Sequence, residues 1–223
     1  MKSNGKNTTG LPVPTIRRLP LYLSFLKSFN DIEGTFISAP EIARELHIDS
    51  TQITKDFSYI NVKGKTKVGY KTSEIIQIIE DFLGYHEPKK AFLVGIGNLG
   101  LALIKYNAFS KEGLKIIMGF DINEEITGTE INDTKIFNIN KIEENFIKTP
   151  VDIGIITVPS GHAQKVADIM INCGIKAIWN FSATPISIPD HIIVENTSID
   201  SGLAMITWKL NKNKPLIYKN RIL

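Results

Sequence analysis

Residues 91–121 decide the fold: AFLVGIGNLG at 91–100, then a helix-like stretch, then IIMGFD at 116–121. The first apolar run ends in glycines 95, 97 and 100, which have G-x-G-x-x-G spacing. The second apolar run ends in Asp121, 21 residues after the last glycine. Strand, glycine turn, helix and a second strand closed by an acid are the parts of a dinucleotide-binding βαβ unit.

Each part of this unit has a physical role. Gly95 permits the tight turn, Gly97 lets the backbone approach a pyrophosphate, and Gly100 lets the helix pack on the strand. The helix N-terminus offers free N–H groups to the phosphates. Asp121 is placed to bind a ribose and to repel a 2′-phosphate, which favours NAD(H) over NADP(H). The candidate cofactor contacts of this unit are Gly95, Ile96, Gly97, Asn98, Leu99, Gly100 and Asp121.

Two alternatives stay open for this segment. The three glycines can serve a tight strand–helix turn without any ligand. Asn98 can cap the helix instead of contacting a phosphate.

The composition is that of an ordinary globular protein, with 43% hydrophobic and 22% charged residues and a net charge of +3 over 223 residues. No stretch approaches the length of a membrane span, and residues 1–10 lack the apolar segment of a secretory signal, so we expect a cytoplasmic protein. The single cysteine, Cys173, excludes an internal disulfide framework. The four histidines show no metal-ligand spacing, so we expect no metal.

The N-terminal third has the pattern of a winged helix-turn-helix. Helices are expected at residues 15–29, 39–46, 51–59 and 72–82, with Ser38 as the N-cap of the second. The glycine-punctuated segment 61–70 has the shape of a basic wing. Residues 51–72 hold five lysines against one acid, which favours a phosphate backbone as partner over a merely solvated surface.

Beyond residue 90 the pattern alternates strands and helices, as in a doubly wound parallel sheet. Strands are expected at 91–94, 116–120, 135–137, 151–158, 175–181 and 191–195, and helices at 99–110, 141–147, 161–173 and 200–210. The expected organisation is a disordered leader (1–12), a winged-helix domain (13–84), a linker (85–90), a Rossmann NAD(H)-binding domain (91–197) and a C-terminal dimerisation helix with a tail (198–223).

A winged helix followed by such a Rossmann domain resembles the Rex family of bacterial redox-sensing repressors. The resemblance covers nearly all of residues 14–211. It rests on the segments RLPLY at 18–22, KDFSY at 55–59, GIGNLG at 95–100, VPSGHAQ at 158–164, Asn180-Phe181 and VEN at 194–196.

The resemblance implies a homodimer that exchanges its C-terminal helix and binds a palindromic double-stranded operator through its winged helices. It also implies that NADH weakens DNA binding by changing how the two subunits are set. It adds Tyr106, Val158, Pro159, Asn180 and Ile199 to the cofactor candidates. For Pro159 and Asn180, roles in stabilising turns are the alternatives. The DNA-binding candidates are Ser38, Gln52, Thr54, Lys55, Ser58, Tyr59, Lys63, Lys65, Thr66, Lys67 and Tyr70.

The sequence departs from the family pattern at the DNA interface. Thr54 stands where the family's recognition helix usually has an arginine, and the wing carries Lys65 and Lys67 around the position of its usual arginine. Lysine keeps the charge but lacks the planar fork of donors. We therefore expect altered, relaxed or weakened operator binding.

A second departure concerns the redox switch. In some family members an arginine on the first helix pairs with an aspartate near the last helix, and these positions are Ser24 and Ser198 here. Ile199 replaces the aromatic residue beside that aspartate, whereas Tyr106 matches a family tyrosine. Losing both halves of an ion pair together is expected when a switch is abandoned, because one half alone would be an uncompensated charge.

Two other classes of protein compete with this interpretation. An NAD-dependent oxidoreductase needs a proton donor near its substrate, but the Tyr59–Lys63 spacing that resembles one precedes the Rossmann unit. A CoA-binding ligase subunit fits the sheet but leaves the winged helix unexplained. We therefore expect a DNA-binding regulator without catalytic activity.

Overall fold

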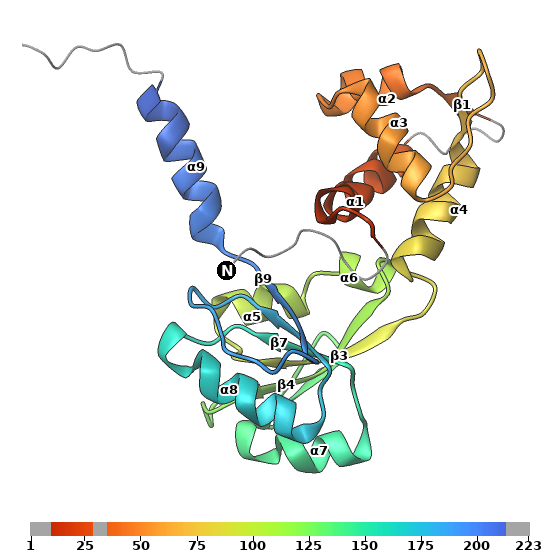
Figure 1. The fold of residues 1–223 in the computed structure, drawn as a ribbon. Coiled ribbons are helices and arrows are strands. Elements are labelled where there is room, and N and C mark those ends of the chain that lie inside the picture. The colour runs from red at the N-terminus through yellow and green to blue at the C-terminus, as the bar shows by residue number, and fades with distance from the viewer. Residues whose placement is uncertain (1–9, 29–34, 213–223) are drawn as a thin grey trace, which may run out of the picture. The chain divides into compact units, whose positions relative to one another are not determined.

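The computed structural model describes residues 10–28 and 35–212, which belong to two compact units, Met1–Glu87 and Pro88–Leu223 (Figure 1). Residues 1–9 of the expected leader lie outside the described residues. Leu11 is only 5% exposed, so the ordered chain begins before residue 13. The unit boundary falls within the expected linker at 85–90, but Lys89 already opens a strand, which shortens that linker.

Four helices of the N-terminal unit follow the expected order with small shifts of their ends. They are α1 (Val13–Ser28), α2 (Ala39–Leu46), α3 (Ser50–Tyr59) and α4 (Thr72–Leu83). Ser38 caps α2 in a reciprocal capping box with Glu41, and Asp49 caps α3. Two short antiparallel strands, β1 (Phe36–Ile37) and β2 (Tyr70–Lys71), pair at the base of the wing.

The core of this unit lies where the four helices meet. Its fully buried side chains include Leu19, Tyr22, Leu26, Ile42, Ile53, Phe57, Ile75 and Ile79. The ring of Phe57 packs edge-on against Tyr22 at 5.6 Å and against Tyr70 at 5.1 Å between centroids. Recognition helix, first helix and wing base are therefore packed around one aromatic side chain.

The wing closes through a tight turn between Lys65 and Gly69, which form an isolated antiparallel bridge. The Lys65 N–H donates to the Gly69 carbonyl oxygen at 2.7 Å, and the Gly69 N–H donates back at 2.9 Å. Lys67, in the middle of this turn, has a positive φ of 65°. The expected basic hairpin is present, although its regular pairing is confined to these few residues.

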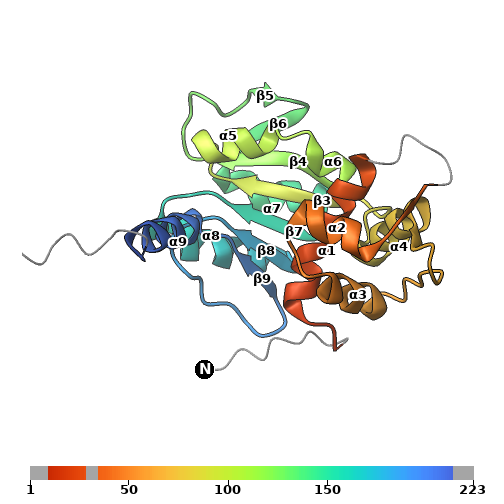
Figure 2. The same ribbon diagram turned by 90° about the horizontal axis from the view of Figure 1, so that it is seen from above.

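The C-terminal unit is a seven-stranded sheet with strand order β5-β6-β4-β3-β7-β8-β9 (Figure 2). Its strands are β3 (Lys89–Val94), β4 (Leu114–Asp121), β5 (Glu130–Ile131), β6 (Thr134–Asn138), β7 (Ile153–Ile156), β8 (Ala177–Asn180) and β9 (Ile193–Asn196). All neighbours pair in parallel except β5 with β6. If the edge strand β5 is left out, the strand order is that of the Rossmann fold. From β3 the chain adds strands first toward one edge of the sheet and then, beginning with β7, toward the other edge. The expected doubly wound sheet is confirmed.

Helices cover both faces of this sheet (Figure 1). They are α5 (Asn98–Ile104) and α6 (Ala108–Lys111) on one face, and α7 (Ile142–Lys148), which follows the short 3-10 helix η1 (Ile139–Lys141), with α8 (Ser160–Cys173) on the other. The single helix expected at 99–110 is wrong. It breaks after Ile104, where the side-chain amide of Asn132 donates to the carbonyl oxygen of Ile104 at 3.0 Å and satisfies the helix end.

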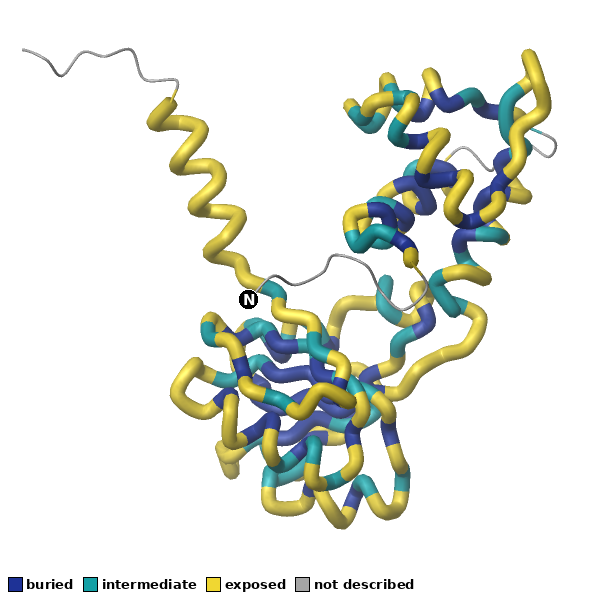
Figure 3. Tube along the Cα trace, viewed as in Figure 1, coloured by how far each residue is buried: buried dark blue, intermediate teal, exposed yellow. Residues whose placement is uncertain are grey.

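The last helix, α9 (Ile199–Lys212), is exposed along its whole length (Figure 3). Its exposed apolar side chains are Ile199, Leu203, Met205, Ile206, Trp208 and Leu210. Among the described residues, no helix has the length and apolar character needed to cross a membrane.

Candidate nucleotide site and nucleic-acid interface

The glycine turn connects β3 to α5 at the carboxyl edge of the sheet. Gly95 has φ +99°, and a Cβ at that position would lie 2.8 Å from Cγ1 of Val158, so only glycine fits without strain. A Cβ on Gly100 would lie 2.0 Å from the carbonyl oxygen of Gly95. These two glycines fix the path of the turn and the close seating of α5.

Gly97 differs from both, because a Cβ there would meet nothing within 4 Å. The side of the turn on which a side chain would project is therefore open. Next to it, the first N–H groups of α5 have no acceptor within the helix. This is the cradle that the close approach of a pyrophosphate requires.

Asp121 ends β4 and faces this turn. Its Oδ2 accepts a hydrogen bond from the Ile96 N–H at 2.5 Å, and its Oδ1 accepts one from the Asn123 N–H at 2.9 Å. Each carboxylate oxygen keeps acceptor capacity beyond these bonds. The carboxylate is thus fixed beside the turn and can still accept from ribose hydroxyls.

Thr157, which follows β7, was missed by the sequence analysis. Its hydroxyl lies 2.6 Å from the Gly95 carbonyl oxygen and 3.1 Å from that of Val94, and it donates to this pair of acceptors. Val158 lies directly against Gly95, and Pro159 is the N-cap residue of α8. The structure therefore brings the glycine turn, Asp121 and the 157–159 segment together where β3 and β7 reverse the strand order.

Asn180 occupies the turn-stabilising role that was the alternative for it. The residue is 0% exposed. Its amide nitrogen donates to the Thr184 carbonyl oxygen at 2.9 Å and to Asn196 Oδ1 at 2.8 Å, and its own oxygen accepts from the backbone and hydroxyl of Ser182. No polar group of this side chain is left to face a ligand.

Two further cofactor candidates lie away from the turn. Tyr106 is 54% exposed and packs edge-on against Phe109, beside a pocket of about 230 Å³ at the opposite, amino edge of the sheet. Ile199 is 69% exposed and follows the edge strand β9, three strands from β3, or about 14 Å in strand spacings. Within one chain, neither residue joins the candidate nucleotide site.

The two positions of the family's switch are both occupied by uncharged serines. Ser24 is exposed on α1. The Ser198 hydroxyl accepts from the Ser201 N–H at 3.3 Å, and the Ser198 carbonyl accepts from the Ser201 hydroxyl at 2.8 Å, so Ser198 caps α9. The structure gives neither serine a charged partner.

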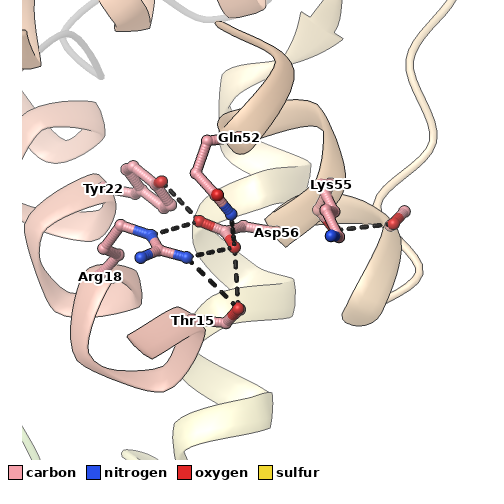
Figure 4. Close-up of polar contacts among 7 residues, drawn as sticks. Thr15, Arg18, Tyr22, Gln52, Lys55 and Asp56 are labelled. Carbon is pink, nitrogen blue, oxygen red and sulfur yellow. Dashed lines mark hydrogen bonds and ion pairs between the residues drawn. The ribbon is translucent and has the colours of Figure 1, made fainter. Parts of the chain in front are cut away.

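In the N-terminal unit, five hydrogen bonds from four side chains converge on the buried carboxylate of Asp56 in α3 (Figure 4). The donors are Thr15 Oγ1 at 2.8 Å, Arg18 Nε at 2.6 Å and Nη2 at 2.8 Å, Tyr22 Oη at 2.7 Å and Gln52 Nε2 at 2.9 Å. Burial alone would raise the pKa of Asp56, but these hydrogen bonds outweigh it and lower the pKa. Asp56 therefore stays ionised and ties the recognition helix to α1.

This network is not predicted by the local sequence pattern. The only local signal for it is the spacing of Arg18 and Tyr22, which lie four residues apart on one face of α1. Burial raises the pKa of Tyr22, and its hydrogen bond to Asp56 adds to the rise, so the hydroxyl stays a donor at neutral pH.

Three DNA-binding candidates are held by other contacts. The Ser38 hydroxyl caps α2, the ring of Tyr70 packs on Phe57, and the Gln52 amide turns toward Asp56. The Ser58 and Thr54 hydroxyls donate to carbonyl oxygens within α3, at 2.7 Å and 3.0 Å. These two hydroxyls remain exposed as acceptors.

The remaining candidates face solvent and are Lys55, Tyr59, Lys63, Lys65, Thr66 and Lys67. Four of these six are lysines, and they lie on the recognition helix and the wing that follows it. Lys65 places its Nζ over the Phe36 ring, 5.4 Å from the centroid. This surface can bind a phosphate backbone through its exposed ammonium groups.

Two family models match the chain, one for each unit. "Putative DNA-binding protein N-terminus" covers residues 10–58, and "CoA binding domain" covers residues 86–184. The second description agrees with the nucleotide-binding type of sheet. The first accounts for the winged helix that a CoA-binding ligase subunit would leave unexplained.

Relatives match nearly the whole chain. The redox-sensing transcriptional repressor Rex of Bacteroides fragilis is 42% identical over 209 residues, which are 94% of this chain and 95% of that protein. The crystal structure of RSP, a Rex-family repressor, with β-NAD⁺ and operator DNA has a TM-score of 0.84 at 31% identity, over 91% of this chain and 93% of that one. The RSP complex with β-NADH has a TM-score of 0.81 at 31% identity, over 91% and 95%. The chain therefore belongs to the Rex family of redox-sensing transcriptional repressors, and it is a regulator and not an enzyme.

Proposed function

We propose that this protein binds NAD(H) at the Gly95–Gly100 turn and double-stranded operator DNA through α3 and the wing, and that NADH lowers its operator affinity. The observation that carries the proposal is the open cradle at Gly97 beside the fixed carboxylate of Asp121, in a chain that also holds a lysine-rich winged helix. The RSP complexes with β-NAD⁺, β-NADH and operator DNA support both ligands.

The nucleotide would bind across the carboxyl ends of β3 and β4. The pyrophosphate would lie over Gly97 and accept hydrogen bonds from the first N–H groups of α5, and the ribose hydroxyls would donate to Asp121. Because Asp121 is a carboxylate, a ribose 2′-phosphate would be repelled, which selects NAD(H) over NADP(H).

DNA binding would rest on phosphate contacts from the exposed lysines, with Lys55 on α3 at the centre of the surface. Each phosphate contact releases condensed counterions, so the affinity would fall steeply with salt. Two winged helices in a homodimer would read two half-sites of a pseudo-palindrome. A repressor acts where the chromosome is, so we place the protein in the cytoplasm.

Helix α9 would form the dimer contact. Six of its apolar side chains are 53–69% exposed. Four of them, Ile199, Leu203, Ile206 and Leu210, follow at spacings of four, three and four and form one apolar stripe, which is typical of a helix that packs against another subunit. Exchange of α9 between subunits would also bring the partner's chain to Tyr106 and Ile199, the exposed cofactor candidates that lie away from the glycine turn.

The response to NADH would run without the arginine–aspartate pair, because Ser24 is uncharged and Ser198 caps α9. The coupling between NADH and DNA is then expected at the low end of the usual range for allosteric proteins, about five- to tenfold. In the double variant S24R/S198D the coupling should rise.

The test is a titration of NADH and NAD⁺ into the purified protein, followed by operator binding of each form. Asp121→Ala should lower NADH affinity at least tenfold and leave DNA binding without nucleotide unchanged. Lys55→Ala should lower operator affinity and leave NADH affinity unchanged. Failure of the wild type to bind either nucleotide would reduce the glycine motif to a structural turn, and full operator affinity in Lys55→Ala would overturn the placement of the DNA surface.

A further inference from the structure

Gln52 lies on the first turn of α3, half-buried, one helical turn before Asp56. Its amide nitrogen donates to Asp56 Oδ1 at 2.9 Å (Figure 4). We propose that Gln52 is the residue that reads an adenine in the operator's major groove, and that Asp56 holds its amide in the orientation this requires. The inference rests on the proposed DNA-binding function and assigns it a specific base contact.

The direction of the amide is set by chemistry. An ionised carboxylate only accepts hydrogen bonds, so the nitrogen of Gln52, and not its oxygen, must face Asp56. Asp56 itself is 0% exposed and is fixed by Thr15, Arg18 and Tyr22. The Gln52 amide is therefore anchored to a rigid acceptor, with its oxygen directed away from it.

What remains unbonded on Gln52 matches adenine. The amide has two N–H donors and one carbonyl acceptor, and the contact with Asp56 uses one donor. Within the described residues, the second N–H and the oxygen Oε1 have no partner. One donor and one acceptor on a planar amide are what the N7 acceptor and N6 donor of adenine bind in the major groove.

The position of Gln52 fits this role. Residues 52, 55 and 59 follow one another at helical spacings of three and four, so Gln52 lies on the same side of α3 as the exposed Lys55 and Tyr59. Lys55 would contact the adjacent phosphate or base edge from the same ridge.

The hydroxyls of Thr51, Thr54 and Ser58 on α3 lack such a free donor–acceptor pair. The Thr54 hydroxyl donates to the Ser50 carbonyl oxygen, and the Ser58 hydroxyl donates to that of Lys55. The Thr51 hydroxyl bonds to the N-cap Asp49. Each of these hydroxyls has its only proton in use, which leaves an acceptor but no donor–acceptor pair.

Holding the amide in advance reduces the side-chain entropy that DNA binding would otherwise cost. An amide that pairs with Asp56 only to stabilise α3 is the structural alternative. The two roles differ in outcome, since a structural role changes the affinity for all sequences alike and a reading role changes discrimination at one base pair.

The experiment uses the full chain and an operator selected from randomised duplexes by the wild type. Each adenine of a half-site is replaced in turn by 7-deazaadenine, which pairs normally but lacks the N7 acceptor. The variant Gln52→Met keeps the side-chain length and removes the amide. Thr51→Val is the matched control at an exposed position of the same helix, outside the DNA-binding candidates.

The wild type should lose at least about fivefold in affinity at one adenine per half-site, because 7-deazaadenine removes one hydrogen bond of a bidentate contact that contributes about 5- to 150-fold. Gln52→Met should show a similar loss on unmodified DNA and no additional loss at that adenine. Thr51→Val should keep the 7-deazaadenine penalty.

A 7-deazaadenine penalty that persists in Gln52→Met, or an equal loss by that variant on every sequence, would overturn the role. A wild type that selects no operator and binds all duplexes equally would instead overturn the proposed function. Thermal unfolding of each variant distinguishes loss of the contact from loss of the fold.

Discussion

The guanidinium of Arg18 on α1 grips the buried carboxylate of Asp56 on α3 through two hydrogen bonds, Nε to Oδ2 at 2.6 Å and Nη2 to Oδ1 at 2.8 Å. This bidentate pair is the strongest kind of charge-assisted contact, and it joins the helix that opens the domain to the helix that would read DNA. The orientation of the recognition helix therefore depends on an ion pair as well as on apolar packing.

Removing the Arg18 charge should destabilise the N-terminal unit. In Arg18→Met the carboxylate of Asp56 stays buried without its cation, and the cost should be about 3 kcal/mol in the free energy of unfolding. Chemical denaturation followed by circular dichroism measures it.

Lys27→Met is the matched control, because Lys27 pairs with Glu80 at 2.7 Å while its side chain is 42% exposed. An exposed pair contributes at most about 1 kcal/mol. Equal losses in the two variants would show that the Asp56 network adds nothing to stability.

Stability should fall in acid through the same carboxylate. The pKa of Asp56 is lowered in the folded state because its hydrogen bonds outweigh the effect of burial. Its contribution is therefore complete above the unfolded pKa of about 4 and is lost as the pH falls through the lower folded pKa.

Unfolding curves of the wild type and Asp56→Asn between pH 7 and pH 2 provide the measurement. The stability difference between the two proteins should shrink as the pH drops below about 4. Glu41 and Asp49 also have lowered pKa values, through hydrogen bonds from Ser38 and from Thr51. They contribute equally to both proteins, so the stability difference between wild type and variant isolates the contribution of Asp56. A pH-independent difference would contradict the prediction.

Substitutions at two glycines of the nucleotide turn should distinguish an effect on NADH binding from an effect on folding. Gly97→Ala adds a methyl group into open space, so stability should be unchanged while NADH affinity falls at least tenfold because the pyrophosphate loses its close approach. Gly95→Ala forces a side chain into φ +99° and against Val158, so stability and affinity should both fall. Calorimetry with NADH and thermal unfolding check both variants, and undiminished NADH binding by Gly97→Ala would exclude the cradle.

At Lys67 in the wing, a change to glycine should raise the stability of the fold and lower its affinity for DNA. Its φ of 65° costs a non-glycine residue about 1 kcal/mol, so Lys67→Gly should stabilise the fold by that amount. The same change removes an exposed charge, so operator affinity should drop and the salt dependence should weaken by about one counterion.

Asn61→Gly is the control, since Asn61 has a similar φ of 60° and carries no charge. It should relieve strain, although less than at Lys67 because asparagine tolerates this conformation, and leave DNA affinity unchanged. If Lys67→Gly keeps full affinity and the full salt slope, Lys67 makes no DNA contact.

The sequence by itself determined the local features of this protein. The helical periodicity, the apolar runs, the glycine spacing and the cap at Ser38 depend on neighbours within a few residues, and they predicted the winged helix and the Rossmann sheet. The nucleotide turn and Asp121 were predictable because strand order places the carboxyl ends of β3 and β4 side by side.

Only the tertiary structure decided which polar side chains are free to bind. Asn180 and Tyr70 have the residue types of ligand contacts, yet Asn196 together with nearby Ser182 and Thr184 occupies the amide of Asn180, and the ring of Tyr70 packs on Phe57. The reverse holds for Thr157 and Asp56, whose roles follow from contacts 62 and 38 residues away in the chain. Polar groups form hydrogen bonds with whichever partners folding brings close, and no local sequence pattern records that pairing.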